Sequence, residues 1–260
     1  MDIATYPRGY IRPPYIQISL RTALDMRDRN FGQKLTEILW TSEPRYSPTR
    51  LGLDFEKEVP CEANEEFLNN WCVIKTKNYN GTDYKFPKKL WWKNKSSLKC
   101  NGSFMHKFTA TTGVEVHGSL MVTFAYRDRI DWKEMFLSLC ELMQPQLAMM
   151  HVFTAENCPP EKREANFQTG NFSGLSNPKI PSLGWMFVAG EAFYKPVSDF
   201  DLQGLEIDRK DYGSYSVLEI AKGAKEIIGD LQKFESRRDR LLEAFPLPIV
   251  KRYNSLLDPL

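Results

Sequence analysis

The chain has 260 residues, with 35 Lys and Arg against 33 Asp and Glu and a formal net charge of +2. Hydrophobic residues make up 42% of it, which excludes a chain that is disordered throughout and allows one sizeable core. No apolar run reaches the roughly 20 residues of a membrane span, and the first residues lack the basic and apolar regions of a secretory signal. The five cysteines are scattered without a C-x-x-C pair, which is typical of reduced thiols. We therefore expect a cytoplasmic protein with no membrane partner.

The N-terminal part predicts a strand followed by a helix. Residues 15–20 alternate apolar and polar side chains, as a strand with one buried face does. Residues 22–40 predict a helix whose apolar face consists of Leu24, Phe31, Leu35, Ile38 and Leu39. Residues 41–58 predict a surface connection, and residues 65–74 fit a short helix or a strand equally well.

Residues 75–99 stand out by their charge, with eight lysines against one acid, Asp83. Phe86, Trp91 and Trp92 are interspersed among the lysines. Lysines that neutralise phosphates and aromatic rings that stack on bases can bind nucleic acid. The same composition is typical of an edge hairpin whose lysines prevent association between sheets. Because no nucleic-acid-binding motif accompanies the charge, we favour the hairpin.

The middle of the chain predicts two neighbouring strands within residues 103–126, then a helix and a further strand at residues 149–153. In residues 114–124 the even-numbered positions are apolar and the odd-numbered positions are mostly polar, as on a half-buried strand. Residues 131–144 predict the helix, because Asp131 is a suitable N-cap. Its apolar stripe consists of Trp132, Met135, Phe136, Leu139, Cys140 and Met143.

The C-terminal part begins with a long loop, residues 154–182, that contains four prolines. Strands are predicted over residues 180–190 and 212–220, with an acidic loop at residues 199–211 between them, and a helix follows. No flexible linker divides the chain. We therefore predict a single α+β domain, residues 1–260, whose largely antiparallel sheet is covered by helices near residues 22–40, 131–144 and 230–245.

Motifs for enzymatic chemistry are missing from the sequence. It contains no phosphate-binding loop, dinucleotide fingerprint, zinc-protease motif or nucleophile elbow. Of the three histidines, His106 and His151 have apolar neighbours and fit the core, whereas His117 falls on a polar face with Glu115. A solvated Glu115–His117 pair is favoured over an acid–base pair, although an enzyme whose site assembles from scattered residues stays open. We predict no catalytic residues, no metal and no cofactor.

Three motifs in the C-terminal half resemble a known family. They are GSLMVTF at residues 118–124 followed by the Trp132 helix, LGWMFVAG at residues 183–190, and FESRRDRLLEAF at residues 234–245. In this order they resemble the immunity proteins of bacterial polymorphic toxin systems, specifically the immunity protein 52 family. Residues 75–99 and 154–182 do not fit the family and are predicted to be insertions. The resemblance implies a cytoplasmic protein, without catalytic residues, that binds a cognate toxin delivered by a secretion system such as type VI, often a nuclease.

The leading hypothesis is thus an immunity protein, not an enzyme, that forms a tight one-to-one or two-to-two complex with its toxin. Inhibitors of nucleases commonly present carboxylates that imitate phosphates. The predicted partner-binding residues are therefore Glu191, Asp199, Asp201, Glu206 and Asp208. The same stretch also fits a solvated acidic loop. The alternative function is nucleic-acid binding through residues 75–99.

Overall fold

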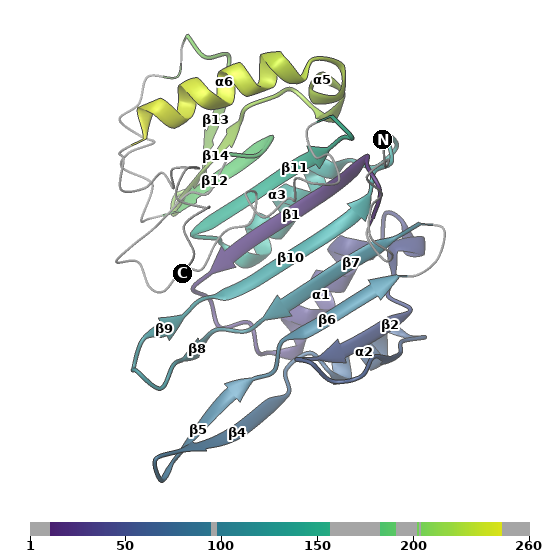
Figure 1. Ribbon diagram of the computed structural model, residues 1–260, viewed down its shortest axis with the longest axis vertical. Helices are drawn as coiled ribbons and strands as arrows, with labels where there is room; N and C mark the ends of the chain where they lie inside the picture. Colours follow the sequence, from purple (N-terminus) through teal and green to yellow (C-terminus); the bar gives the residue numbers. More distant parts are fainter. Residues whose placement is uncertain (1–10, 95–97, 157–182, 191–201, 203, 246–260) are drawn as a thin grey trace, which may run out of the picture.

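The computed structural model describes residues 11–94, 98–156, 183–190, 202 and 204–245, and its main feature is a ten-stranded antiparallel sheet (Figure 1). In spatial order its strands are β13 (Asp208–Asp211), β14 (Tyr215–Glu219), β12 (Met186–Gly190), β11 (Leu147–Phe153), β1 (Tyr15–Thr22), β10 (Gly118–Ala125), β7 (Cys100–Met105), β6 (Leu90–Asn94), β2 (Arg50–Leu53) and β3 (Val59–Pro60). The strand that comes first in the sequence, β1, therefore lies in the middle of the sheet, where Tyr15 is opposite both Ala125 and Phe153.

Two hairpins lie outside this sheet. One consists of β4 (Ile74–Tyr79) and β5 (Thr82–Pro87), and the other of β8 (Phe108–Thr109) and β9 (Glu115–Val116). Both extend from the same end of the molecule, below β6 and β10 in Figure 1. The lysine-rich segment thus contributes the β4–β5 hairpin and then, through β6, a strand of the main sheet.

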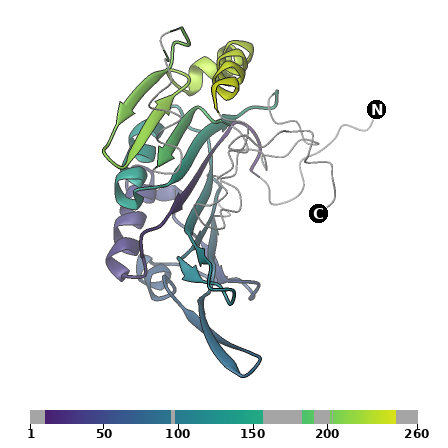
Figure 2. The same cartoon turned by 90° about the vertical axis from the view of Figure 1, so that its left-hand side faces the viewer.

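Helices lie on both faces of the sheet. On one face are α1 (Arg29–Trp40), α2 (Asn64–Asn69) and α3 (Trp132–Met143), and on the other is α6 (Leu231–Ala244) (Figure 1 and Figure 2). The rings of Phe234 and Phe245 pack against His151 and Phe187, which places α6 over β11 and β12. A 3-10 turn, η1 (Pro44–Tyr46), and the short helix α5 (Ala224–Gly229) connect other elements. The predicted α+β class, with an antiparallel sheet covered by helices, is confirmed.

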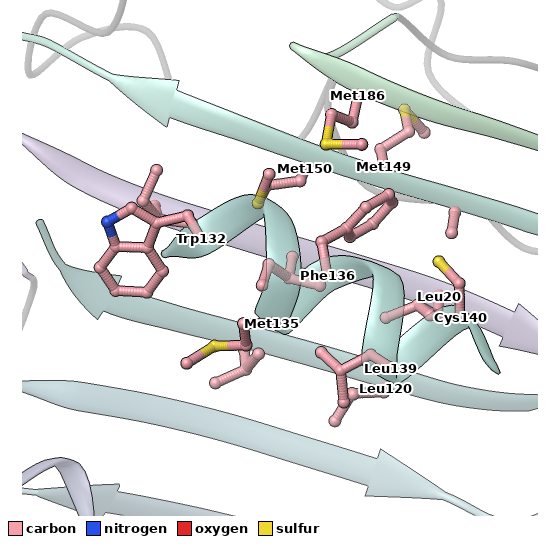
Figure 3. Packing of buried hydrophobic residues seen from close by; sticks show 14 of the residues in the cluster. Leu20, Leu120, Trp132, Met135, Phe136, Leu139, Cys140, Met149, Met150 and Met186 are labelled. Carbon is pink, nitrogen blue, oxygen red and sulfur yellow. The ribbon is translucent and has the colours of Figure 1, made fainter. Parts of the chain in front are cut away.

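The helix α3 forms as the sequence predicts. The carboxylate of Asp131 accepts a hydrogen bond from the backbone N–H of Glu134 at 2.9 Å and caps the helix. All six residues of the predicted stripe are buried, and they face sheet residues that include Leu20, Leu120 and Met150 (Figure 3). The helix ends where Gln144 adopts a left-handed conformation, directly before Pro145.

The alternation predicted for residues 114–124 holds for residues 118–124, which lie in β10, whereas Val114 is exposed and residues 115–116 form β9 of a separate hairpin. The even-numbered residues of β10, among them Leu120, Val122 and Phe124, are buried beneath the helices, and its odd-numbered residues are half-exposed on the opposite face. Because side chains on a strand point alternately to the two faces, this pattern sets which face of the sheet carries the main core.

The first helix is shorter than predicted, because α1 begins at Arg29 rather than at residue 22. The carboxylate of Asp28 caps it by accepting a hydrogen bond from Asn30 N–H at 2.7 Å. Before the cap, Thr22 ends β1 and donates its hydroxyl to the Met143 carbonyl. In the connection that follows, the Met26 carbonyl accepts from the Trp71 indole. Residues 65–74, which were ambiguous, contain α2 and lead into β4.

Neighbouring tryptophans on β6 lie on opposite faces of the sheet. Trp92 is buried in the core, edge-on to Phe67 with ring centroids 5.3 Å apart. Trp91 is half-exposed on the other face, where its indole N–H donates to the Asp54 carbonyl at 3.0 Å. Trp92 therefore has no ring face available to a ligand.

Within the part of the chain that the structure describes, no helix combines the length and apolar character needed to cross a membrane. Cys61, Cys72, Cys100 and Cys140 are free thiols. Burial raises the pKa of the Cys100 and Cys140 thiols well above its usual range, so both are inert packing groups.

Candidate functional site

The acidic residues predicted to bind a partner are divided by the structure. Glu191, Asp199 and Asp201 lie outside the described residues, whereas Glu206 and Asp208 line a wide cleft of about 720 Å³. Asp208 begins β13, so the end of the predicted acidic loop is an edge strand. The cleft is lined by residues of both charges. The acids are Glu206, Asp208, Glu226 and Asp230, and the bases are Lys222, Lys225, Lys233 and Arg237.

Glu206 is engaged by basic side chains of α6. One of its oxygens lies 2.8 Å from Arg237 and 3.4 Å from Lys233. The charge of Lys233, and to a smaller extent that of Arg237, holds the pKa of Glu206 below its usual range. Arg237 is itself buried, and it also donates to the Ile220 carbonyl and pairs with Glu226. The charge of Glu206 is therefore balanced within the protein.

The histidines are placed in the interior. His106 and His151 are buried, as predicted: the His106 ring bonds the Trp71 carbonyl, and His151 accepts from Trp185 N–H. The prediction of a solvated His117 is wrong, because only 3% of this residue is exposed. Burial lowers the pKa of all three, to about 3 for His151.

Glu115 and His117 have different surroundings. Glu115 pairs with Lys107 at 2.8 Å, whereas burial lowers the pKa of His117 although the charge of Glu115 opposes this shift. Across the described ranges, no three His, Cys, Asp or Glu side chains gather closely enough to hold a metal ion.

The β4–β5 hairpin presents an aromatic and basic face. Residues paired across the two strands point to the same side, so Lys75 with Phe86, Lys77 with Tyr84, and Tyr79 with Thr82 share one face. The rings continue from one hairpin to the next: centroids are 6.0 Å apart from Tyr79 to Tyr84, 6.2 Å from Tyr84 to Phe86, and 5.7 Å from Phe86 to Phe108 on β8.

A pocket of about 280 Å³ lies along this face. We call it the hairpin groove, and it is lined by Asp54, Lys75, Lys77, Tyr79, Phe86, Pro87, Lys89, Met105 and Phe108. Lys75 pairs with Asp54, which ties the hairpin to the turn after β2. Since residues from the turn after β2 and from β4, β5, β7 and β8 meet here, the groove combines parts of the chain that are far apart in sequence.

Sequence reasoning identified the lysines of this site but missed most of its aromatic residues. Of the aromatic residues in this site it linked only Phe86 with the lysines, and not Tyr79, Tyr84 or Phe108. The signal that could have found them is Asn80-Gly81 between two alternating segments, which is a strong indication of a two-residue hairpin turn. That turn fixes the register, and the register places the rings on one face.

Comparisons with known proteins show a fold likeness. No known protein family matches the sequence, and no curated protein matches it. Among solved structures, the chain is similar to the Pseudomonas aeruginosa T6SS protein PA0821, with a TM-score of 0.50 and 12% sequence identity. The match covers 84% of this chain and 70% of that one. The chain thus shares its overall fold with a protein of a type VI secretion system.

Proposed function

We propose that this protein is an immunity protein that binds and neutralises a cognate toxin, a nuclease-type effector delivered by a type VI secretion system. The observation that carries the proposal is the fold shared with a T6SS protein over most of both chains. The resemblance of the C-terminal motifs to the immunity protein 52 family supports the same class. In this function the protein acts in the cytoplasm by stoichiometric binding, without turning over a substrate.

The motifs on which the resemblance rests lie in strands and a helix of the core. Residues 118–124 lie in the central strand β10, and residues 234–245 include most of α6. Trp185 precedes β12, is buried, and donates its indole N–H to the Ala221 carbonyl at 2.8 Å. These motifs therefore describe the scaffold, and the residues that select a particular toxin lie on the surface, where contacts can vary between related pairs.

The alternative function, nucleic-acid binding through residues 75–99, has one observation in its favour. Lys77 and Lys85 are exposed, and neither forms an ion pair within the described residues. One of the three aromatic residues predicted to stack on bases, Trp92, is however buried in the core and cannot contact a base. Phosphate contacts alone give binding that is independent of sequence and sensitive to salt.

Co-expression tests the proposal. An effector that co-purifies with this protein should kill cells when produced alone in the cytoplasm and should be tolerated when this protein is produced with it. The purified pair should elute as one complex of one-to-one or two-to-two stoichiometry. A matched control is the Phe136→Ala variant, which removes core packing and should lose protection through unfolding. Death of cells that contain folded, abundant wild-type protein would refute the immunity role.

A further inference from the structure

Exposed apolar side chains gather at one end of the described structure. Of the seven large hydrophobic residues that are exposed within the described ranges, five lie in the turn after β2, in β3 or in the two hairpins: Phe55, Val59, Ile74, Tyr79 and Val114. Figure 2 shows these hairpins extending away from the helices. Exposed apolar residues that cluster, rather than occur singly, mark interaction surfaces.

The hairpin groove supplies a concave site within this end. Its walls are Tyr79, Phe86 and Phe108, and Lys77 and Lys89 line it as well. Aromatic side chains carry much of the binding energy in protein interfaces, because they bury a large apolar area at a low entropic cost. An apolar side chain of a partner can therefore seat against these rings.

The charge of this end is incompletely balanced. Lys75, Lys88 and Lys107 are paired with Asp54, Glu56 and Glu115. Lys77 and Lys89, in contrast, have no ion pair among the described residues, and they line the groove. A partner that fits must supply the missing negative charge.

We propose that the hairpin groove receives an acidic segment of the toxin, with carboxylates at Lys77 and Lys89 and an apolar side chain against Tyr79, Phe86 and Phe108. This inference rests on the immunity role proposed above and names the chemistry of the partner. The groove then anchors the toxin and sets specificity and association rate.

Binding kinetics with a catalytically inactivated form of the co-purifying effector test the groove. The double variant Lys77→Glu/Tyr79→Ala should weaken binding at least about tenfold, because it removes a cation and an aromatic wall together. One control is Lys85→Glu, which makes the same charge change on the opposite face of the same hairpin. The other is Lys34→Glu, which makes the same charge change at an exposed position of α1, outside the groove.

Both controls should bind within about twofold of wild type, since neither touches the groove. Unfolding midpoints equal to wild type establish that every variant is folded. Wild-type affinity of the Lys77→Glu/Tyr79→Ala variant would overturn the proposal, and so would an equal loss in Lys85→Glu, which would show a diffuse charge effect.

Failure of the wild-type protein to bind the effector would count against the immunity role alone. A second measurement then tests the groove independently of the effector. An acidic peptide with one tryptophan and a deoxythymidine oligonucleotide of equal charge are titrated into the isotope-labelled protein. The peptide should shift resonances in β4, β5 and β8. Absence of these shifts, or tighter binding of the oligonucleotide, would refute an acidic protein segment as the ligand.

Discussion

Two glycines lie against the two tryptophans of β6, and they offer a direct test of the packing on each face of the sheet. Gly102 on β7 is opposite Trp92, and Gly52 on β2 is opposite Trp91. A Cβ atom built on either glycine would overlap atoms of the facing indole ring. Since neither glycine has a positive φ, the backbone itself accepts alanine and favours it by about 0.4–1 kcal/mol.

The cost of the clash should differ between the two faces. Trp92 is enclosed by Trp40 and Phe67, with centroids 6.2 Å and 5.3 Å away, and its ring has no room to move. Gly102→Ala should therefore destabilise the protein by about 3 kcal/mol, the upper part of the usual range for overpacking. Gly52→Ala meets the half-exposed ring of Trp91, which can rotate toward solvent but then loses its hydrogen bond to the Asp54 carbonyl. Gly52→Ala should therefore cost about 1 kcal/mol, the value of one hydrogen bond.

Equilibrium unfolding in urea measures both values, and a double-mutant cycle identifies the cause. In a Trp92→Leu background the clash disappears, so Gly102→Ala should cost much less there than in the wild-type background. The reasoning is refuted if Gly102→Ala costs the same in both backgrounds, or if Gly52→Ala proves the more damaging of the two.

Other predictions concern the core, a buried ion pair, pH and the basic segment. Phe136→Ala should cost about 3–5 kcal/mol in urea unfolding; an unchanged midpoint would contradict the core position of Phe136. Arg237→Ala, which leaves a carboxylate and a carbonyl without their partner, should cost about 3–5 kcal/mol by the same assay. The folded pKa of His151, about 3, is below the unfolded value, so its contribution is present above pH 6.5 and is lost as pH falls towards 3. The free energy of unfolding should therefore decrease by about 1.4 kcal/mol per pH unit in that window, and His151→Gln should remove this part of the slope. Binding of DNA by residues 75–99 should be weak, independent of sequence and lost as salt rises; discrimination between sequences at physiological salt would refute this.

The elements that the sequence predicted well have one apolar face and a local signal at their ends. In α3 the cap and the stripe agree, and in β10 the alternation is uninterrupted. The start of α1 was misplaced because apolar spacing continues through Leu24, whereas the Asp28 cap and contacts to distant residues decide where the helix begins. On β6, two adjacent tryptophans give no alternation, so only pairing with β2 and β7 determines which one is buried.

The candidate site was harder to predict than the fold. The excess of lysine in residues 75–99 is visible in the sequence, but the groove needs Asp54, Met105 and Phe108 from other elements. The burial of His117 was missed because the alternating pattern was taken to continue from β9 into β10, whereas the two strands belong to different sheets. Long-range contacts of this kind leave no local pattern for sequence reasoning to detect.

The central position of β1 has a consequence for how the chain folds. This strand is made first, yet its two neighbours, β10 and β11, are synthesised only after residue 117 and residue 146. The edges of β1 therefore stay unpaired until these residues have emerged from the ribosome, and contacts of such long sequence separation form slowly. In the immunity role proposed above, the protein must be folded before the toxin is active, so this topology favours synthesis of this chain ahead of the toxin.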